Sequence, residues 1–236
     1  MTVISAVVFD MYGTLTPNWP KSFWDEQKRT SAASLDLAEA EWIAALDATW
    51  HERVSGSFGT SLLDTFREVA AQLGQSPTDA QLAAAVQHRY EAHRKTQRLR
   101  PDVLPTLGAL RADGLKIALV SDCTHELSDQ WDASELAEFF DATVFSCCEG
   151  TRKPDPKLFL AAAQRLGVPP ETCLYVGDGG GDEMAGSAAV GMHPVLLTAP
   201  DWLESSTPGR PDETWPGLRA VSLTEILWIL AELAAE

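Results

Sequence analysis

The chain lacks the features that mark a membrane protein, a disulfide framework or a zinc finger. No apolar run approaches the roughly 20 residues of a membrane-spanning helix. The N-terminal MTVISAVVFD has no basic residue before its apolar run, so it does not resemble a signal peptide. The four cysteines show no C-x-x-C spacing and two are adjacent, which argues against zinc and against a disulfide framework. We therefore expect reduced thiols, a cytoplasmic location and no membrane partner.

Basic residues are also scarce. The chain has 18 Lys and Arg against 34 Asp and Glu, which gives a formal net charge of -16. Such a surface repels nucleic acid, so no nucleic-acid partner is expected. A site for a small anionic substrate would need local positive charge or a bound metal. The 236 residues are enough for one large domain, or for a core domain with an insertion.

Five short, largely apolar runs predict buried strands, and helical patterns separate most of them. Strands that are buried on both faces appear in a sequence as continuous apolar residues. Strands that alternate with helices form a parallel sheet with right-handed crossovers. The predicted fold class is α/β, with a doubly wound, Rossmann-like parallel sheet. The predicted strands are residues 6–9, 116–120, 142–147, 172–176 and 193–198.

A long stretch without strand patterns follows the first strand. Residues 21–98 show helical spacing, for example in Leu62, Phe66 and Val69, which share one helix face. This stretch predicts a small helical bundle that is inserted into the α/β domain. The predicted domains are a core, residues 1–16 with 99–236, and an inserted helical domain, residues 17–98.

Polar side chains follow the ends of four predicted strands. In open α/β sheets the carboxyl ends of the strands meet at one edge, where ligands bind. A carboxylate that is held at a strand end can attack an electrophile and form a covalent intermediate. Taken singly, each residue also has an ordinary structural role, such as a turn-capping carboxylate or an exposed loop lysine. In chain order the residues are Asp10, Ser121, Asp122, Lys153, Asp178 and Asp182.

Their combination is more specific than any one of them. Asp10-Met-Tyr-Gly-Thr14, Ser121, Lys153-Pro154 and Gly177-Asp178 with Asp182 resemble the four motifs of the haloacid dehalogenase-like (HAD) hydrolase superfamily. The resemblance covers most of the chain, and the motifs come in the right order on the right elements. The helical insertion resembles the cap that this superfamily carries directly after its first motif.

This resemblance implies a role for each motif residue. Asp10 would be the nucleophile, and Lys153 would orient it and neutralise developing charge. Carboxylates with water and substrate oxygens are the ligands that Mg²⁺ prefers, and a bound ion would let an anionic phosphate approach. The implied catalytic residues are Asp10, Tyr12, Ser121 and Lys153; the metal ligands are Asp10, the Tyr12 carbonyl, Asp178 and Asp182; Thr14, Ser121 and Asp122 would contact substrate.

Tyr12 departs from the phosphatase pattern. Superfamily phosphatases usually have a second Asp here, which protonates the leaving group and then activates water. A phenol with a pKa of about 10 is a poor base at neutral pH. Asp-x-Tyr-Gly-Thr is instead similar to the first motif of the L-2-haloacid dehalogenases, which use no metal. Those enzymes, however, usually carry a Ser-Asn sequence where this chain has Gly177-Asp178.

Because two close carboxylates need a cation, the sequence favours a Mg²⁺-dependent phosphatase that acts on a small phosphorylated metabolite. Tyr12 would then donate a proton to the leaving group, or the acid would come from the cap or the substrate. A metal-independent dehalogenase and a non-catalytic protein that binds a phosphorylated ligand are the alternatives. Arg53, just before the hinge sequence Ser-Gly-Ser-Phe-Gly, is the predicted substrate contact of the cap. Both a monomer and a homodimer are compatible with the sequence.

Overall fold

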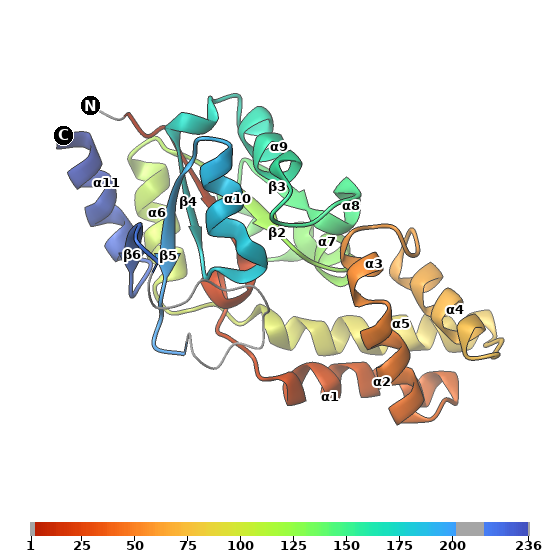
Figure 1. Ribbon diagram of the computed structural model, residues 1–236. Helices are drawn as coiled ribbons and strands as arrows, with labels where there is room; N and C mark the ends of the chain where they lie inside the picture. Colours follow the sequence, from red (N-terminus) through yellow and green to blue (C-terminus); the bar gives the residue numbers. More distant parts are fainter. Residues whose placement is uncertain (1–2, 202–214, 236) are drawn as a thin grey trace.

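A six-stranded parallel sheet forms the centre of the protein in a computed structural model that describes residues 3–201 and 215–235. The strand order is β3-β2-β1-β4-β5-β6, so the first strand lies in the middle of the sheet (Figure 1). The strands are β1 (Ala6–Phe9), β2 (Lys116–Ser121), β3 (Ala142–Phe145), β4 (Cys173–Gly177), β5 (His193–Leu197) and β6 (Leu218–Ala220).

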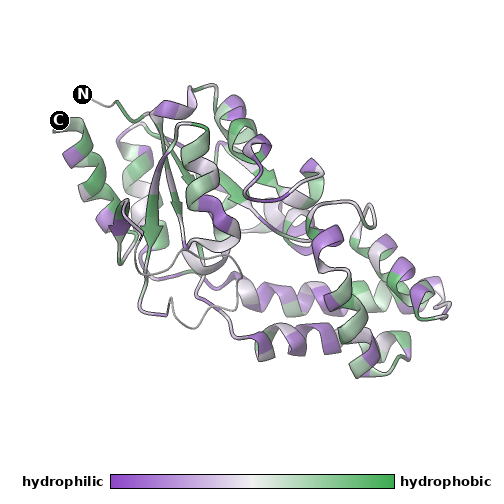
Figure 2. Cartoon of the chain, viewed as in Figure 1, coloured by the Kyte–Doolittle hydropathy of each residue, from purple (hydrophilic) through white to green (hydrophobic). Residues whose placement is uncertain are grey.

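Helices cover both faces of this sheet. Because successive side chains of a strand point to opposite faces, Val7 and Phe9 join one apolar cluster while Ala6 and Val8 join another. The first cluster contains residues of α6 (Val103–Ala112), α7 (His125–Gln130) and α11 (Glu225–Ala235), and the second contains residues of α9 (Pro156–Leu166) and α10 (Glu183–Ala189). Figure 2 shows apolar residues concentrated along the strands and α11.

The segment that follows β1 contains only helices and turns. Its helices are α1 (Lys21–Ala32), α2 (Glu39–Ala48), α3 (Trp50–Val54), α4 (Leu62–Gln72) and α5 (Asp79–Arg94). A third apolar cluster, which includes Trp42, Phe66 and Leu82, draws its buried members from residues 32–85 alone. The helical insertion therefore has its own core, and it lies beyond one end of the sheet (Figure 1).

The predicted α/β fold with a helical insertion is confirmed, and each of the five predicted strands is present. The predicted third strand was too long: it ends at Phe145, and α8 (Ser146–Glu149) follows, with the Ser146 hydroxyl accepting a hydrogen bond from the Cys123 backbone at 3.0 Å. The strand β6 was missed because Leu-Arg-Ala is too short and mixed to stand out. The exact domain boundaries remain a prediction. Among the described residues, no helix is both long and apolar enough to cross a membrane.

Candidate active site

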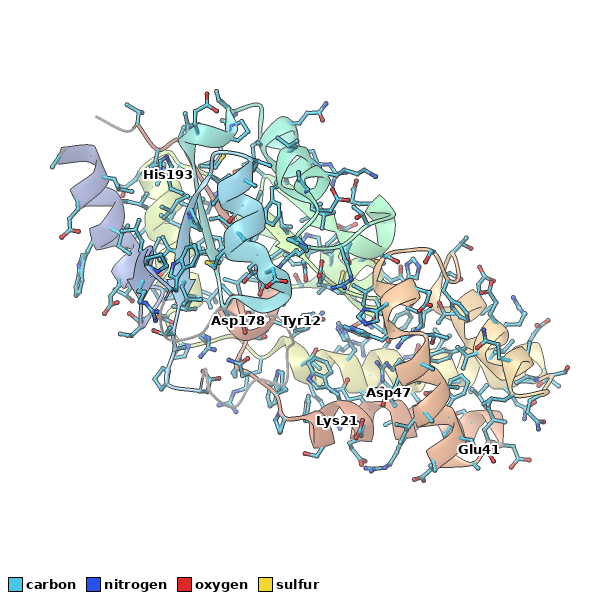
Figure 3. The ribbon with its side chains drawn as sticks, in the orientation of Figure 1. Tyr12, Lys21, Glu41, Asp47, Asp178 and His193 are labelled. Carbon is cyan, nitrogen blue, oxygen red and sulfur yellow. The ribbon has the colours of Figure 1, made fainter. Side chains whose placement is uncertain are left out.

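Three buried carboxylates meet at the carboxyl end of the central strands. Asp10 follows β1 and Asp178 follows β4, and these strands are neighbours with Phe9 opposite Val176. Glu183 is the first residue of α10. One carboxylate oxygen from each of the three acids lies within 4.8 Å of the others, and none of the three residues is more than 6% exposed. Figure 3 labels Asp178 and Tyr12 at the end of the sheet that faces the helical insertion.

Lys153 supplies a positive charge to this group. Its Nζ lies 2.5 Å from Asp10 Oδ1 and 2.5 Å from Glu183 Oε2, and the side chain is buried. Burial alone would lower the pKa of Lys153, but the Asp10 and Glu183 charges raise it well above its usual value. The lysine is therefore protonated at neutral pH. Its backbone N–H donates to Asp122 Oδ1 at 3.0 Å, which holds the loop against the end of β2.

Glu183 is held by three donors. Besides Lys153, the Tyr175 hydroxyl donates to Oε2 at 2.7 Å and the Gly179 N–H donates to Oε1 at 2.8 Å. Burial raises the pKa of Glu183 to about 8; the Lys153 charge opposes this rise, and the Asp10 and Asp178 charges add to it. The donors favour the ionised carboxylate, since hydrogen bonds to the charged form stabilise it.

The turn after β1 brings the backbone unusually close to Asp178. Gly13 has φ +83°, and a Cβ atom at this position would lie 2.4 Å from Asp178 Oδ2. Only glycine fits such a conformation and such a distance without strain. The glycine therefore lets the turn that carries Asp10 pack directly against the residue at the end of β4.

Arg100 clamps the same turn from the other side. Its guanidinium donates to the Gly13 carbonyl at 2.9 Å and to the Thr14 carbonyl at 3.0 Å, and it pairs with Asp201 at 2.7 Å. The Thr14 hydroxyl in turn donates to Asp10 Oδ2 at 3.1 Å. Both oxygens of Asp10 thus have a donor, Lys153 on one side and Thr14 on the other, which fixes the orientation of the carboxylate.

Ser121 and Asp122 end β2 beside β1. Ser121 is fully buried, and its Oγ has no hydrogen-bond partner among the described residues. A buried hydroxyl without a partner is destabilising, so it is expected to meet a ligand or water. Asp122 accepts from the Lys153 backbone, and burial raises the pKa of its carboxyl group.

Side chains of the helical insertion contact this end of the sheet through Tyr12 and through α7. The Tyr12 hydroxyl lies 2.8 Å from His93 Nε2, and the Tyr12 ring packs edge-on against Trp24. Burial raises the pKa of Tyr12 above its usual value and lowers that of His93 to about 4, so a protonated phenol faces a neutral imidazole. Arg89 on α5 pairs with the buried Glu126 on α7 at 2.7 Å.

Two predicted site residues lie apart from the carboxylate group. Asp182 is exposed and has a left-handed backbone, with φ 53°, whereas the next residue, Glu183, lies with Asp10 and Asp178. The buried Arg53 donates to the Leu46 carbonyl at 2.7 Å, within the helical insertion.

Sequence reasoning missed three residues that shape the site: Glu183, Tyr175 and Arg100. The only available indication was the position of Glu183, an acid at the predicted start of a helix and adjacent to the chosen Asp182. Tyr175 lies inside an apolar strand, and Arg100 lies in the segment that returns from the helical insertion. Neither position carries a pattern that points to Glu183 or to the turn at Gly13.

Comparison with known proteins identifies the family of the chain. The family model of the haloacid dehalogenase-like hydrolases matches residues 4–189. The chain belongs to this family. A glyceraldehyde 3-phosphate phosphatase of Methanopyrus kandleri is 30% identical over 99% of this chain and 100% of its own length. A phosphoglycolate phosphatase of Salmonella typhimurium is 30% identical over 83% of this chain and 81% of its own length.

Solved structures of HAD proteins share the fold. A HAD phosphatase from Thermococcus onnurineus superposes with a TM-score of 0.66 at 21% identity, covering 96% of this chain and 98% of that one. A 2-haloacid dehalogenase from Pseudomonas syringae pv. Tomato DC3000 superposes with a TM-score of 0.68 at 21% identity, covering 98% of this chain and 99% of that one. Because both activities occur on this fold, the structural likeness does not distinguish between them.

Proposed function

We propose that this HAD hydrolase is a Mg²⁺-dependent phosphatase that acts on a small phosphorylated metabolite, with Asp10 as the nucleophile. The observation that carries the proposal is the buried group of Asp10, Asp178 and Glu183 around a single lysine. The two relatives described above, each 30% identical to this chain, are named as phosphatases of small phosphorylated compounds, which supports the proposed phosphatase function.

The residues present fit a magnesium ion. The side-chain donors are carboxylate oxygens, which Mg²⁺ prefers, and the three buried carboxylates outnumber the single positive charge of Lys153. Asp10, Asp178 and the Tyr12 carbonyl would hold the ion, with Glu183 in place of Asp182 at the edge of the group. When bound, magnesium would supply positive charge that lets an anionic phosphate approach Asp10.

The reaction that the side chains support has two steps. The Asp10 carboxylate attacks phosphorus, and the bond to the leaving alkoxide breaks as an aspartyl phosphate forms. Thr14 and Lys153 orient Asp10, while Lys153 and the free Ser121 hydroxyl contact the phosphoryl oxygens. Water then attacks the aspartyl phosphate, releases inorganic phosphate and restores the carboxylate.

Tyr12 is the proposed proton donor to the leaving group. Its raised pKa keeps the phenol protonated at neutral pH, and an alkoxide is basic enough to accept its proton. In the second step the attacking water gives up a proton to the Tyr12 phenolate, which restores the phenol at the position where phosphatases usually carry an Asp. His93 Nε2 shares a hydrogen bond with the phenol and is the group that orients it.

A dehalogenase function is the second candidate, because Tyr12 stands where phosphatases usually carry a second Asp. A halide needs no proton to leave, so this chemistry would not require an acid at position 12. Against it stands Asp178: without a cation, a buried carboxylate beside Asp10 would repel an anionic haloacid.

The deciding experiment measures phosphate and halide release in parallel, each with Mg²⁺ and with chelator. Glyceraldehyde 3-phosphate, phosphoglycolate and 2-chloropropionate serve as substrates, and Asp10→Asn is the control. Phosphate release that needs both Mg²⁺ and Asp10 is expected. Halide release in the presence of chelator would contradict the phosphatase proposal and favour a dehalogenase function. Tight binding of a phosphorylated ligand that survives Asp10→Asn, without turnover by the parent chain, would indicate a binding protein.

A further inference from the structure

A second group of metal-binding side chains lies outside the carboxylate site. Cys123 and His125 come directly after Ser121 and Asp122 at the end of β2, and Cys147 and Cys148 lie in α8 after β3. Since β2 and β3 are neighbours, with Ser121 opposite Phe145, the two segments meet at the same edge of the sheet. We propose that Cys147, Cys148 and His125 bind a divalent ion of the zinc class.

The distances between the sulfur atoms suit such an ion. Cys147 Sγ lies 3.8 Å from Cys148 Sγ and 4.0 Å from Cys123 Sγ. Two thiolates that bind one zinc ion at about 2.3 Å in tetrahedral geometry are about 3.8 Å apart. A ring nitrogen of His125 and the sulfurs of Cys147 and Cys148 all lie within 4.8 Å of one another. The three ligand atoms are therefore already placed around a common point.

The surroundings indicate that a ligand belongs there. His125 is only 9% exposed, and its Nε2 has no hydrogen-bond partner among the residues that the structure describes. A buried imidazole nitrogen without a partner is costly unless something binds it. Cys147 and Cys123 are buried while Cys148 is exposed, so an ion can enter from the Cys148 side.

The chemistry of this group differs from that of the carboxylate site. Sulfur and imidazole ligands select zinc-class ions, whereas carboxylate oxygens select magnesium. The two sites can thus hold different metals at once. The expectation of no zinc rested on the spacing of cysteines along the sequence. Cys123 and Cys147 are brought together by the pairing of β2 with β3, which that spacing does not reveal.

A bound ion would also stabilise the contact between the α/β core and the helical insertion. The loop after α3 passes so close to α8 that a Cβ atom on Gly56 would lie 2.2 Å from the Cys147 carbonyl oxygen. The proposed site thus lies between the end of β2, which carries Ser121, and the base of the helical insertion.

The test is a titration of the reduced, Mg²⁺-saturated protein with Cd²⁺, a spectroscopic substitute for zinc, followed by competition with Zn²⁺. Thiolate-to-cadmium charge-transfer absorption should rise to a plateau at one ion per chain, and Zn²⁺ should remove it. Cys148→Ser and His125→Gln should each weaken Cd²⁺ binding by more than about 10-fold, because each removes a ligand.

The chain offers a matched control in Cys173, a buried cysteine on β4 outside the group. Cys173→Ser should bind Cd²⁺ like the parent protein. Cys148 is exposed, so its replacement is expected to leave the fold intact, and circular dichroism checks this. Cadmium binding without the charge-transfer band, or with equal affinity in Cys148→Ser and the parent, would overturn the proposal. Neither result bears on the phosphatase assay.

Discussion

The adjacent acids Asp182 and Glu183 allow a matched test of the candidate active site. Glu183→Gln leaves one amide oxygen to face three donors, Lys153 among them, inside a fully buried environment. Removing one partner of a buried ion pair costs about 3–5 kcal/mol. Because Lys153 keeps Asp10 as a partner, we expect a loss of about 3 kcal/mol in the free energy of unfolding.

The same change should reduce catalysis. Lys153 would no longer be held between two carboxylates, and loss of one positioned charge typically lowers kcat by about 100-fold, or about 3 kcal/mol in the barrier. Asp182→Asn changes an exposed side chain, so its stability should stay within about 0.5 kcal/mol of the parent. Its rate of phosphate release should also stay near that of the parent.

Urea denaturation and Mg²⁺-dependent phosphate release, measured side by side on the two variants, give the comparison. Equal losses in both variants would show that the two acids share the role, and the geometry described above would be refuted. A Glu183→Gln protein with the stability and activity of the parent would refute it as well.

Three further predictions concern single buried positions. Gly13→Ala should abolish phosphate release, because the added Cβ would lie 2.4 Å from Asp178 Oδ2. Gly108→Ala is the control: its Cβ would meet no atom within 4 Å, so the free energy of unfolding should rise by about 0.5–1 kcal/mol. Burial lowers the pKa of His93 to about 4, below its usual 6.5, so the unfolded chain takes up the proton first. Stability should fall by about 3 kcal/mol between pH 6.5 and 4, and His93→Gln should flatten this slope in denaturation experiments. Glu126→Gln should cost about 3–5 kcal/mol in the same assay, because it leaves a buried arginine without its partner; an unchanged value would contradict the pairing.

Local patterns in the sequence were sufficient for most of the fold. Buried strands such as β1 and β2 consist of consecutive apolar residues because both faces of the sheet are covered, so they are recognisable without any partner. The helical spacing of Leu62, Phe66 and Val69 is likewise recognisable along one helix, and all three side chains are buried on α4. The strand β6, with three mixed residues, depends on its neighbour β5 and left no such pattern.

Only part of the candidate active site could be predicted from local sequence patterns. Residues that directly follow a central strand, such as Asp10 and Asp178, reach the common edge because strand direction alone places them there. Whether Asp182 or Glu183 joins Asp10 and Asp178 depends on the backbone torsion angles of a glycine-rich turn. A left-handed residue at Asp182 sends that side chain to solvent and leaves Glu183 in the group.

Patterns among neighbours along the chain were enough to predict β1 to β5 with the helices between them, the helical insertion and the position of the nucleophile candidate, but not β6. Which side chains meet became visible only in three dimensions: Lys153 between two acids, Arg100 on the turn at Gly13, and Cys123 beside Cys147. The physical reason is that charge pairing and ligand geometry act over a few ångströms in space, whatever the separation along the chain.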